Sequence, residues 1–266
     1  MLLGRHMPSP LELALAGAAA FGAGLVNAFA GGGTLISFPT LVALGVPPIV
    51  ANVTNTVALC PGYLGASIAQ RKALVEEGRG LAALFVAAAV GGLAGAGLLV
   101  VSPEALFRGL VPWLLLLAAA LLATQDTLRR RLLGEPKPDG ARVSVGLVAG
   151  VFFGSIYGGY FGAGLGILIL AVLGLWLHAP LPRLNAVKQA LSLVVNVLAA
   201  LAFVFSGKVA WPYAGAMVVG SLVGGHVGGK LSGRVNPRVL RVAIIVVAVG
   251  MAIRFFLRAY SALHLD

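Results

Sequence analysis

Side chains that can bind an anion recur at helical spacing within one apolar stretch of the sequence. Asn185, Lys188, Gln189, Ser192 and Asn196 are spaced i, i+3, i+4, i+7 and i+11, which places them on one face of a helix. Amide, hydroxyl and ammonium groups donate the hydrogen bonds that an oxyanion accepts. This polar stripe therefore predicts an anion-binding helix face.

A second polar stripe occupies the equivalent positions of an earlier apolar stretch. Asn52, Asn55 and Thr56 belong to it, and Asn52 precedes Asn185 by 133 residues. Two alternatives remain for these groups. Lys188 is one turn from the start of its segment and can reach either a ligand or the membrane interface. Each Asn or Gln can bind a ligand or join two helices.

Glycine clusters interrupt the apolar sequence near both stripes. Residues 31–46 read GGGTLISFPTLVALGV, and residues 160–166 read YFGAGLG. Broken helices expose backbone N–H groups and the positive ends of helix dipoles, which attract anions. This interpretation predicts ligand contact at the break residues and a neighbouring asparagine: Asn27, Gly31, Gly32, Gly33, Gly162 and Gly164. The alternative is close helix packing, which is favoured for GGLAGAG at 91–97 and GGHVGGK at 224–230.

The elements that must position these groups are membrane helices. Of the 266 residues, 59% are hydrophobic and 10% are charged, and mean hydropathy is +1.00. A soluble domain has about 25% charged residues. The sequence predicts an all-α, multi-pass bundle in contact with membrane lipid. Its expected segments are 11–30, 34–46, 49–69, 80–101, 105–125, 143–160, 164–177, 184–205, 209–230 and 239–257.

The ten segments form two similar halves. NVTNT at 52–56 aligns with NAVKQ at 185–189, and GGLAGAG aligns with GGHVGGK at the same offset. Because five segments per half is odd, the halves must have opposite orientations in the membrane. We therefore expect two inverted five-segment repeats with broken or re-entrant helices. The predicted organisation is a first repeat at 1–128, a basic cytoplasmic linker at 129–142 and a second, inverted repeat at 143–266.

Charge and cysteine content exclude several classes of function. The net charge of +11 is explained by cationic loops that orient the segments, rather than by nucleic-acid binding. A single cysteine, Cys60, excludes an internal disulfide and a multi-cysteine metal site. The eight Asp and Glu residues lie in or near loops and segment ends, which favours an anion pathway over a metal-cation pathway. No metal site or cofactor is expected.

Taken together, the motifs resemble the sulfite exporter TauE/SafE family of membrane permeases. The resemblance covers nearly the whole chain: the glycine break, LISFPTLVALGVPPIVANVTNT at 35–56, GGLAGAGL at 91–98, the basic central loop and the degenerate second copy. It implies secondary transport of a small sulfur-containing anion, such as sulfite, thiosulfate or an organosulfonate, across a prokaryotic cytoplasmic membrane. The residues alone predict a small anion, and sulfur comes from the resemblance.

Other functions remain as alternatives. A passive anion channel would use the same groups without coupling to a proton or sodium gradient. An assembly protein would use the polar stripes only to bind helices. An intramembrane hydrolase lacks support, because the sequence has no Gly-x-Ser-x-Gly motif. The absence of a P-loop also gives no support for ATP-driven pumping by this chain. The sequence therefore predicts a transporter that is not an enzyme.

Overall fold

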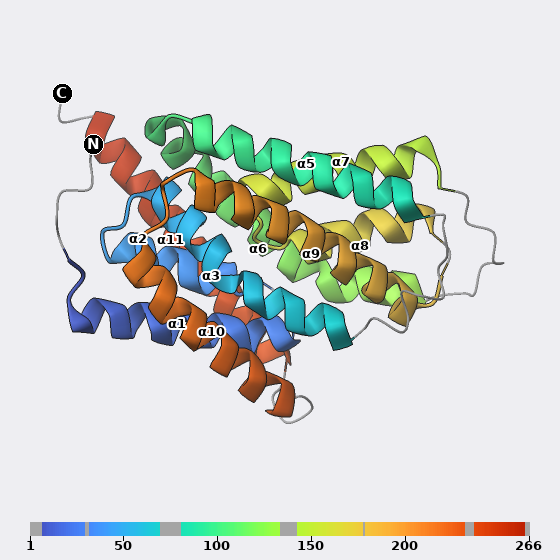
Figure 1. Ribbon diagram of the computed structural model, residues 1–266, viewed down its shortest axis with the longest axis horizontal. Coiled ribbons are helices and arrows are strands. Elements are labelled where there is room, and N and C mark those ends of the chain that lie inside the picture. Colours follow the sequence, from blue (N-terminus) through green and yellow to red (C-terminus); the bar gives the residue numbers. More distant parts are fainter. Residues whose placement is uncertain are drawn as a thin grey trace.

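Helices account for all the secondary-structure elements of the part that the computed structural model describes, which is residues 7–29, 32–69, 81–133, 143–177, 179–231 and 237–263. Figure 1 shows them running roughly along one direction. The helices are α1 (Pro10–Phe29), α2 (Thr34–Ala43), α3 (Pro48–Ala69), α5 (Ala82–Val101), α6 (Glu104–Leu133), α7 (Val145–Tyr160), α8 (Leu165–Trp176), α9 (Leu181–Phe205), α10 (Trp211–Leu231) and α11 (Pro237–Leu263). Each predicted apolar segment coincides with one helix. The prediction of an all-α bundle is therefore confirmed.

Helix lengths separate membrane-spanning elements from shorter ones. Among the described residues, four stretches are long and apolar enough to span a membrane: Pro10–Asn27, Ala82–Val101, Glu104–Leu128 and Arg183–Phe205. In contrast, α2, α7 and α8 have 10, 16 and 12 residues. At 1.5 Å per residue none of these three reaches the roughly 30 Å of a hydrocarbon core. Their lengths agree with the expectation of broken helices.

Large apolar side chains cover the outer surface of the bundle. Trp113, Phe153, Leu175 and Phe205 are each more than half exposed, whereas Phe38, Phe107, Phe161 and Phe203 are fully buried. Lipid is as apolar as these exposed side chains, so the hydrophobic effect does not require their burial in a membrane. Several polar residues, in contrast, are buried inside the bundle, including Ser37, Asn52 and Asn55. This distribution is that of a membrane protein.

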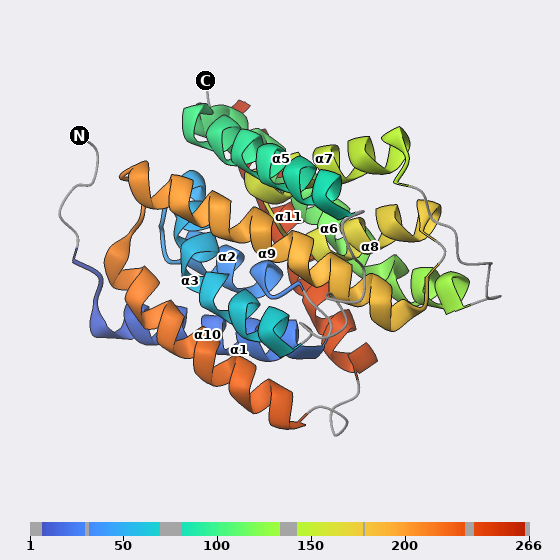
Figure 2. The ribbon, with the colours of Figure 1, turned by 45° about the vertical axis from the view of Figure 1, so that its right-hand side comes forward.

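Two helix pairs pack with their backbones in direct contact, and both views show them side by side: α1 with α10, and α5 with α7 (Figure 1 and Figure 2). A Cβ atom on Gly224 would lie 2.0 Å from the carbonyl oxygen of Phe21. A Cβ atom on Gly95 would likewise lie 2.0 Å from the carbonyl oxygen of Ile156. Glycine is therefore required for helix packing at these two positions, as favoured for the two GG-containing motifs.

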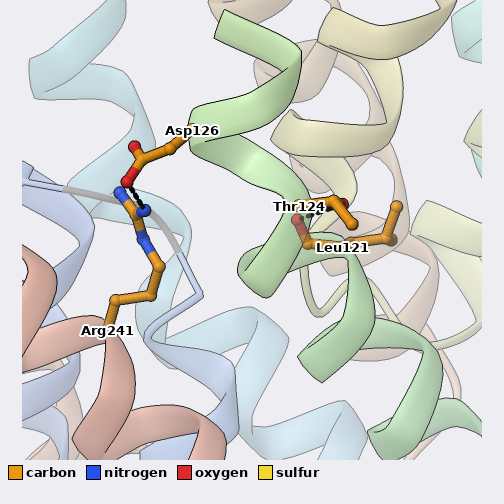
Figure 3. A network of polar contacts seen from close by, with 4 residues as sticks. All are labelled: Leu121, Thr124, Asp126 and Arg241. Atoms are coloured by element: carbon orange, nitrogen blue, oxygen red, sulfur yellow. Dashed lines mark hydrogen bonds and ion pairs between the residues drawn. The ribbon is translucent and has the colours of Figure 1, made fainter. Parts of the chain in front are cut away.

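An ion pair joins the two long helices α6 and α11. Nη1 of Arg241 lies 2.5 Å from Oδ2 of Asp126, as Figure 3 shows. The Arg241 side chain is only 8% exposed, whereas that of Asp126 is 38% exposed. Arg241 is therefore a buried and paired residue. Helix α6 also extends through residues 129–133 of the predicted linker, and residues 134–142 lie outside the described part.

Candidate functional site

The first glycine break is fixed by an asparagine of the preceding helix. Gly32 has φ +90°, a left-handed conformation that suits glycine. The N–H of Gly33, where α2 begins, donates a hydrogen bond to Oδ1 of Asn27 at 2.8 Å. Asn27 and Gly33, both predicted to contact a ligand, therefore bond to each other, and this contact already satisfies the backbone donor. Gly31 lies outside the described residues.

The second glycine break joins α7 to α8 and contains two left-handed residues. Gly162 has φ +78° and Gly164, the N-cap of α8, has φ +77°. The hydroxyl of Tyr157 donates to the carbonyl oxygen of Ala163 at 2.5 Å. Phe161 and Ala163 are almost fully buried. The chain therefore reverses direction inside the protein, where non-helical backbone is tolerated because other protein groups surround it.

Asn55 binds the polar side chains of α2. Its Oδ1 accepts a hydrogen bond from the hydroxyl of Ser37, and its Nδ2 lies 3.4 Å from Oγ1 of Thr34. All three residues are buried. The Asn55 side chain therefore holds α2 against α3 directly after the first break. This is the helix-joining alternative that the sequence left open, and Ser37 and Thr34 are partners that the sequence prediction missed.

Asn52 connects the first polar stripe to the second break. Its Nδ2 donates to the carbonyl oxygen of Tyr160, the last residue of α7, at 2.9 Å. Asn52 is 1% exposed, and its Oδ1 has no hydrogen-bond partner among the described residues. A buried amide oxygen without a partner is unusual in proteins. Asn52 is therefore the member of the first stripe with an acceptor still available. The hydroxyl of Thr56 donates to the Asn52 carbonyl within α3.

The second stripe lies on α9 beside the start of α8. Nζ of Lys188 donates to Oδ1 of Asn185 at 3.2 Å. The Lys188 stem passes close to Gly166, since a Cβ atom there would lie 3.7 Å from Cδ of Lys188. The Lys188 side chain thus lies about two turns into α9, near the N-terminus of α8, where the helix dipole is positive. The ammonium group of Lys188 and the positive N-terminus of α8 both attract negative charge, so together they favour an anion between them.

Farther along α9 the stripe becomes more buried. Ser192 is 2% exposed, and its Oγ has no hydrogen-bond partner among the described residues. Asn196 is bonded within its own helix, because its Nδ2 donates to the Ser192 carbonyl at 2.7 Å. Gln189 is half-buried. Ser155 on α7 was missed as a candidate, although it is fully buried and its Oγ likewise lacks a partner among the described residues.

The predicted residues thus form local groups around the two breaks rather than one assembled pocket. Asn27 with Gly33 lies at the first break, and Asn52 reaches the second break. Asn185 and Lys188 lie near the start of α8. A shallow hollow between α2 and α11 is lined by other residues, including Arg254 and Phe255. In the described part of the chain, no group of three His, Cys, Asp or Glu side chains could hold a metal ion.

Comparison with known proteins agrees with this architecture. The family model for sulfite exporter TauE/SafE matches residues 16–255. The probable membrane transporter protein YfcA of Escherichia coli K12 is 30% identical over 224 residues, covering 80% of this chain and 78% of the relative. A probable membrane transporter protein of Haemophilus influenzae is 27% identical over 208 residues, covering 76% and 78%. No solved structure matches the chain. The chain belongs to the sulfite exporter TauE/SafE family.

Proposed function

We propose that this protein is a secondary transporter that moves a small sulfur-containing anion across the prokaryotic cytoplasmic membrane by alternating access. The observation that carries the proposal is the pair of glycine breaks with polar side chains beside them: Asn27 at the first break, and Asn52 and Lys188 at the second. Backbone N–H groups, amides and one cation form a donor set that suits an oxyanion. The family match supports sulfur chemistry.

We further propose that the chain consists of two inverted repeats. By position in the two halves, α1 corresponds to α7 and α10 corresponds to α5. Helix packing supports the repeat, because α1 packs on α10 and the corresponding helix α7 packs on α5. Likewise α3 packs against its counterpart α9, and α6 against α11. Figure 1 places the end of α3 and the start of α5 on the same side as the end of α6 and the start of α7. Because the intervening sequences carry Arg71, Lys72, Arg79 and the basic linker, we assign that side to the cytoplasm.

Within this proposal, the substrate binds near Asn52, Asn185 and Lys188 and between the two breaks. Gly32, Gly33, Gly162 and Gly164 supply backbone that a small anion can approach closely. Gln189, Ser192, Asn55 and Thr56 complete the polar surroundings. Transport is coupled to a proton or sodium gradient. A site between two breaks from oppositely oriented repeats can be reached alternately from either side of the membrane.

Thermal stabilisation of the purified protein tests the substrate class. The panel is sulfite, thiosulfate, sulfoacetate, taurine, sulfate and chloride. A ligand that binds only the folded state raises the melting temperature with concentration. We expect selective stabilisation by a sulfur-containing anion, lost in Lys188→Ala and retained in the exposed control Arg130→Ala. Equal responses to all six anions would contradict the substrate assignment.

Counterflow in liposomes separates a transporter from the passive channel. Liposomes that contain the protein are preloaded with unlabelled anion. A transporter then takes up labelled anion faster, because its anion-loaded site returns to the outer side faster than its empty site. A channel gives no such acceleration. We expect acceleration, and imposed sodium and proton gradients then identify the coupling ion. Uptake without acceleration would favour the channel.

A further inference from the structure

The closest helix packing in this protein joins helices from different halves of the sequence. Helix α1 of the first half packs on α10 of the second, and α5 of the first half packs on α7 of the second. At both interfaces glycines bring backbone against backbone. A Cβ atom on Gly220 would lie 2.1 Å from the Gly17 carbonyl oxygen, and one on Gly159 would lie 2.1 Å from the Gly92 carbonyl oxygen. No layer of side chains separates these helices, so neither pair can slide without a collision of backbones.

Further contacts extend the first pair into a bundle of α1, α2, α3 and α10, which we name bundle A. Helix α3 is bonded to α10, because the Ser221 hydroxyl donates to the Ala58 carbonyl at 3.1 Å. The N–H of Ala210, directly before α10, donates to Oγ1 of Thr54 at 2.9 Å. Asn55 then holds α2 against α3. Bundle A thus combines three helices of the first half with one of the second.

The second pair extends into a bundle of α5, α7, α8 and α9, which we name bundle B. These helices share a separate hydrophobic core, in which Leu84, Val151, Leu170 and Leu191 are buried together. Gly92 of α5 and Gly158 of α7 both lie against Val195 of α9. Bundle B therefore combines one helix of the first half with three of the second, which is the reverse of bundle A.

Aromatic side chains form part of the contact between the two bundles. Near the non-cytoplasmic ends, Phe38 of bundle A meets Phe161 of bundle B edge to face at 5.4 Å between ring centroids. Phe107 of α6 packs against Phe161 and Tyr160. The larger core also includes Leu99 and Phe203 at this level. The larger core takes residues from helices of both bundles, whereas the second core lies within bundle B.

We infer that bundles A and B, and not the two halves of the sequence, are the units that move against each other during transport. This inference rests on the proposed alternating-access function. Backbone contacts hold α1 to α10 and α5 to α7, so motion of one sequence half against the other would have to break both pairs. The boundary between the bundles runs between α3 and α9, which pack against each other. The Asn52 to Tyr160 hydrogen bond crosses that boundary at the second break.

Distances between paired spin labels distinguish this arrangement from motion of one sequence half against the other. Thioether-linked labels are needed, because sulfite cleaves disulfide-linked ones. The background is Cys60→Ser, and all labelled positions are exposed side chains. Two pairs lie within a bundle but in different halves: Leu11→Cys with Val223→Cys, and Val101→Cys with Val145→Cys. Two pairs lie within a half but in different bundles: Leu11→Cys with Val86→Cys, and Val223→Cys with Leu175→Cys.

Distances are recorded in lipid nanodiscs without anion and with sulfoacetate or sulfite, each at two pH values. We expect narrow, constant distributions for the pairs within a bundle. We expect shifted or multiple distributions for the pairs that span the bundles. Constant distances within each half, with changes within the bundles, would overturn the inference, and so would four constant distances. Anion flux through the same labelled proteins in liposomes reports separately whether the proposed transport function holds.

Discussion

The side-chain amide of Asn52 in α3 donates a hydrogen bond to the carbonyl oxygen of Tyr160, 108 residues later, at 2.9 Å. Tyr160 is the last residue of α7, so its carbonyl lies where the helical hydrogen-bond ladder ends. Such terminal carbonyls need partners from outside their helix. Asn52 is therefore both a member of the first polar stripe and a support for the second break.

Removal of this amide donor is expected to impair transport more than folding. Asn52→Asp keeps the size of the side chain but places an oxygen against the Tyr160 carbonyl. A lost buried hydrogen bond costs about 1–3 kcal/mol when its partner is left unsatisfied. We expect anion flux to fall by about five- to 150-fold if this cost falls on the transport-competent state, because 1.4 kcal/mol corresponds to a factor of ten. Flux into liposomes and the melting temperature are measured together.

Thr124→Ala is the matched control for Asn52→Asp. Thr124 is exposed on α6, and its hydroxyl donates to the carbonyls of Ala120 and Leu121 in its own helix (Figure 3). This control deletes a polar group without affecting either break and should leave flux unchanged. Flux of Asn52→Asp at the level of this control would remove Asn52 from the site.

Glycines within one helix are expected to differ sharply in their tolerance of a methyl group. In α5, a Cβ atom on Gly95 would lie 2.0 Å from the Ile156 carbonyl oxygen, whereas one on Gly97 meets no atom within 4 Å. Gly95→Ala must separate α5 from α7 and should lower the melting temperature. Gly97→Ala should be neutral or stabilising, by up to about 1 kcal/mol. Equal melting temperatures for the two variants would contradict the backbone contact.

Two glycines with left-handed backbone allow a test of the second break that distinguishes a loss of anion flux from a general loss of stability through backbone strain. Gly164 has φ +77° at the start of α8, and Gly207 has φ +69° between α9 and α10. Alanine in this conformation costs about 1–2 kcal/mol at either position. We expect Gly164→Ala and Gly207→Ala to lose similar stability, but only Gly164→Ala to lose most of its anion flux. A similar loss of flux in both variants would show that strain alone is responsible.

Hydrophobicity and helix periodicity were sufficient to predict ten helices and the positions of both breaks. The glycine clusters around 31–33 and 162–164 indicated a break, and Gly32, Gly162 and Gly164 do have left-handed backbone that glycine adopts readily. Helix partners were harder to predict. Nothing near Asn52 in the sequence identifies the Tyr160 carbonyl as its acceptor, and nothing near Arg241 identifies Asp126. These contacts depend on which helices pack together. Helix packing is determined by the shape complementarity of segments that are far apart in the sequence.

The ion pair between α6 and α11 is expected to stabilise the fold through direct coupling of its two residues. Arg241 is buried, so Asp126→Asn leaves a guanidinium with a weaker acceptor. We expect a loss of about 1–3 kcal/mol, the range for hydrogen bonds to charged groups. A double-mutant cycle with Arg241→Gln measures the coupling energy. The exposed residue Arg108, near the opposite end of α6, provides the control variant Arg108→Gln, which should show no coupling with Asp126→Asn. Additive effects of Asp126→Asn and Arg241→Gln would contradict a stabilising pair.

A disulfide within bundle B should leave transport intact, since the bundle moves as one body. A Cβ atom on Gly92 would lie 3.5 Å from Cβ of Val195, within the range of about 3.5–4.5 Å found in disulfides. Gly92→Cys with Val195→Cys, in a Cys60→Ser background, therefore links α5 to α9. Oxidation should raise the melting temperature and leave sulfoacetate flux unchanged. Sulfoacetate is the suitable probe because sulfite would cleave the bond. The reduced double variant is the matched control, and it accounts for any effect of the substitutions themselves. If oxidation stops the flux that the reduced variant retains, α5 and α9 must move relative to each other, and bundle B is not a rigid unit.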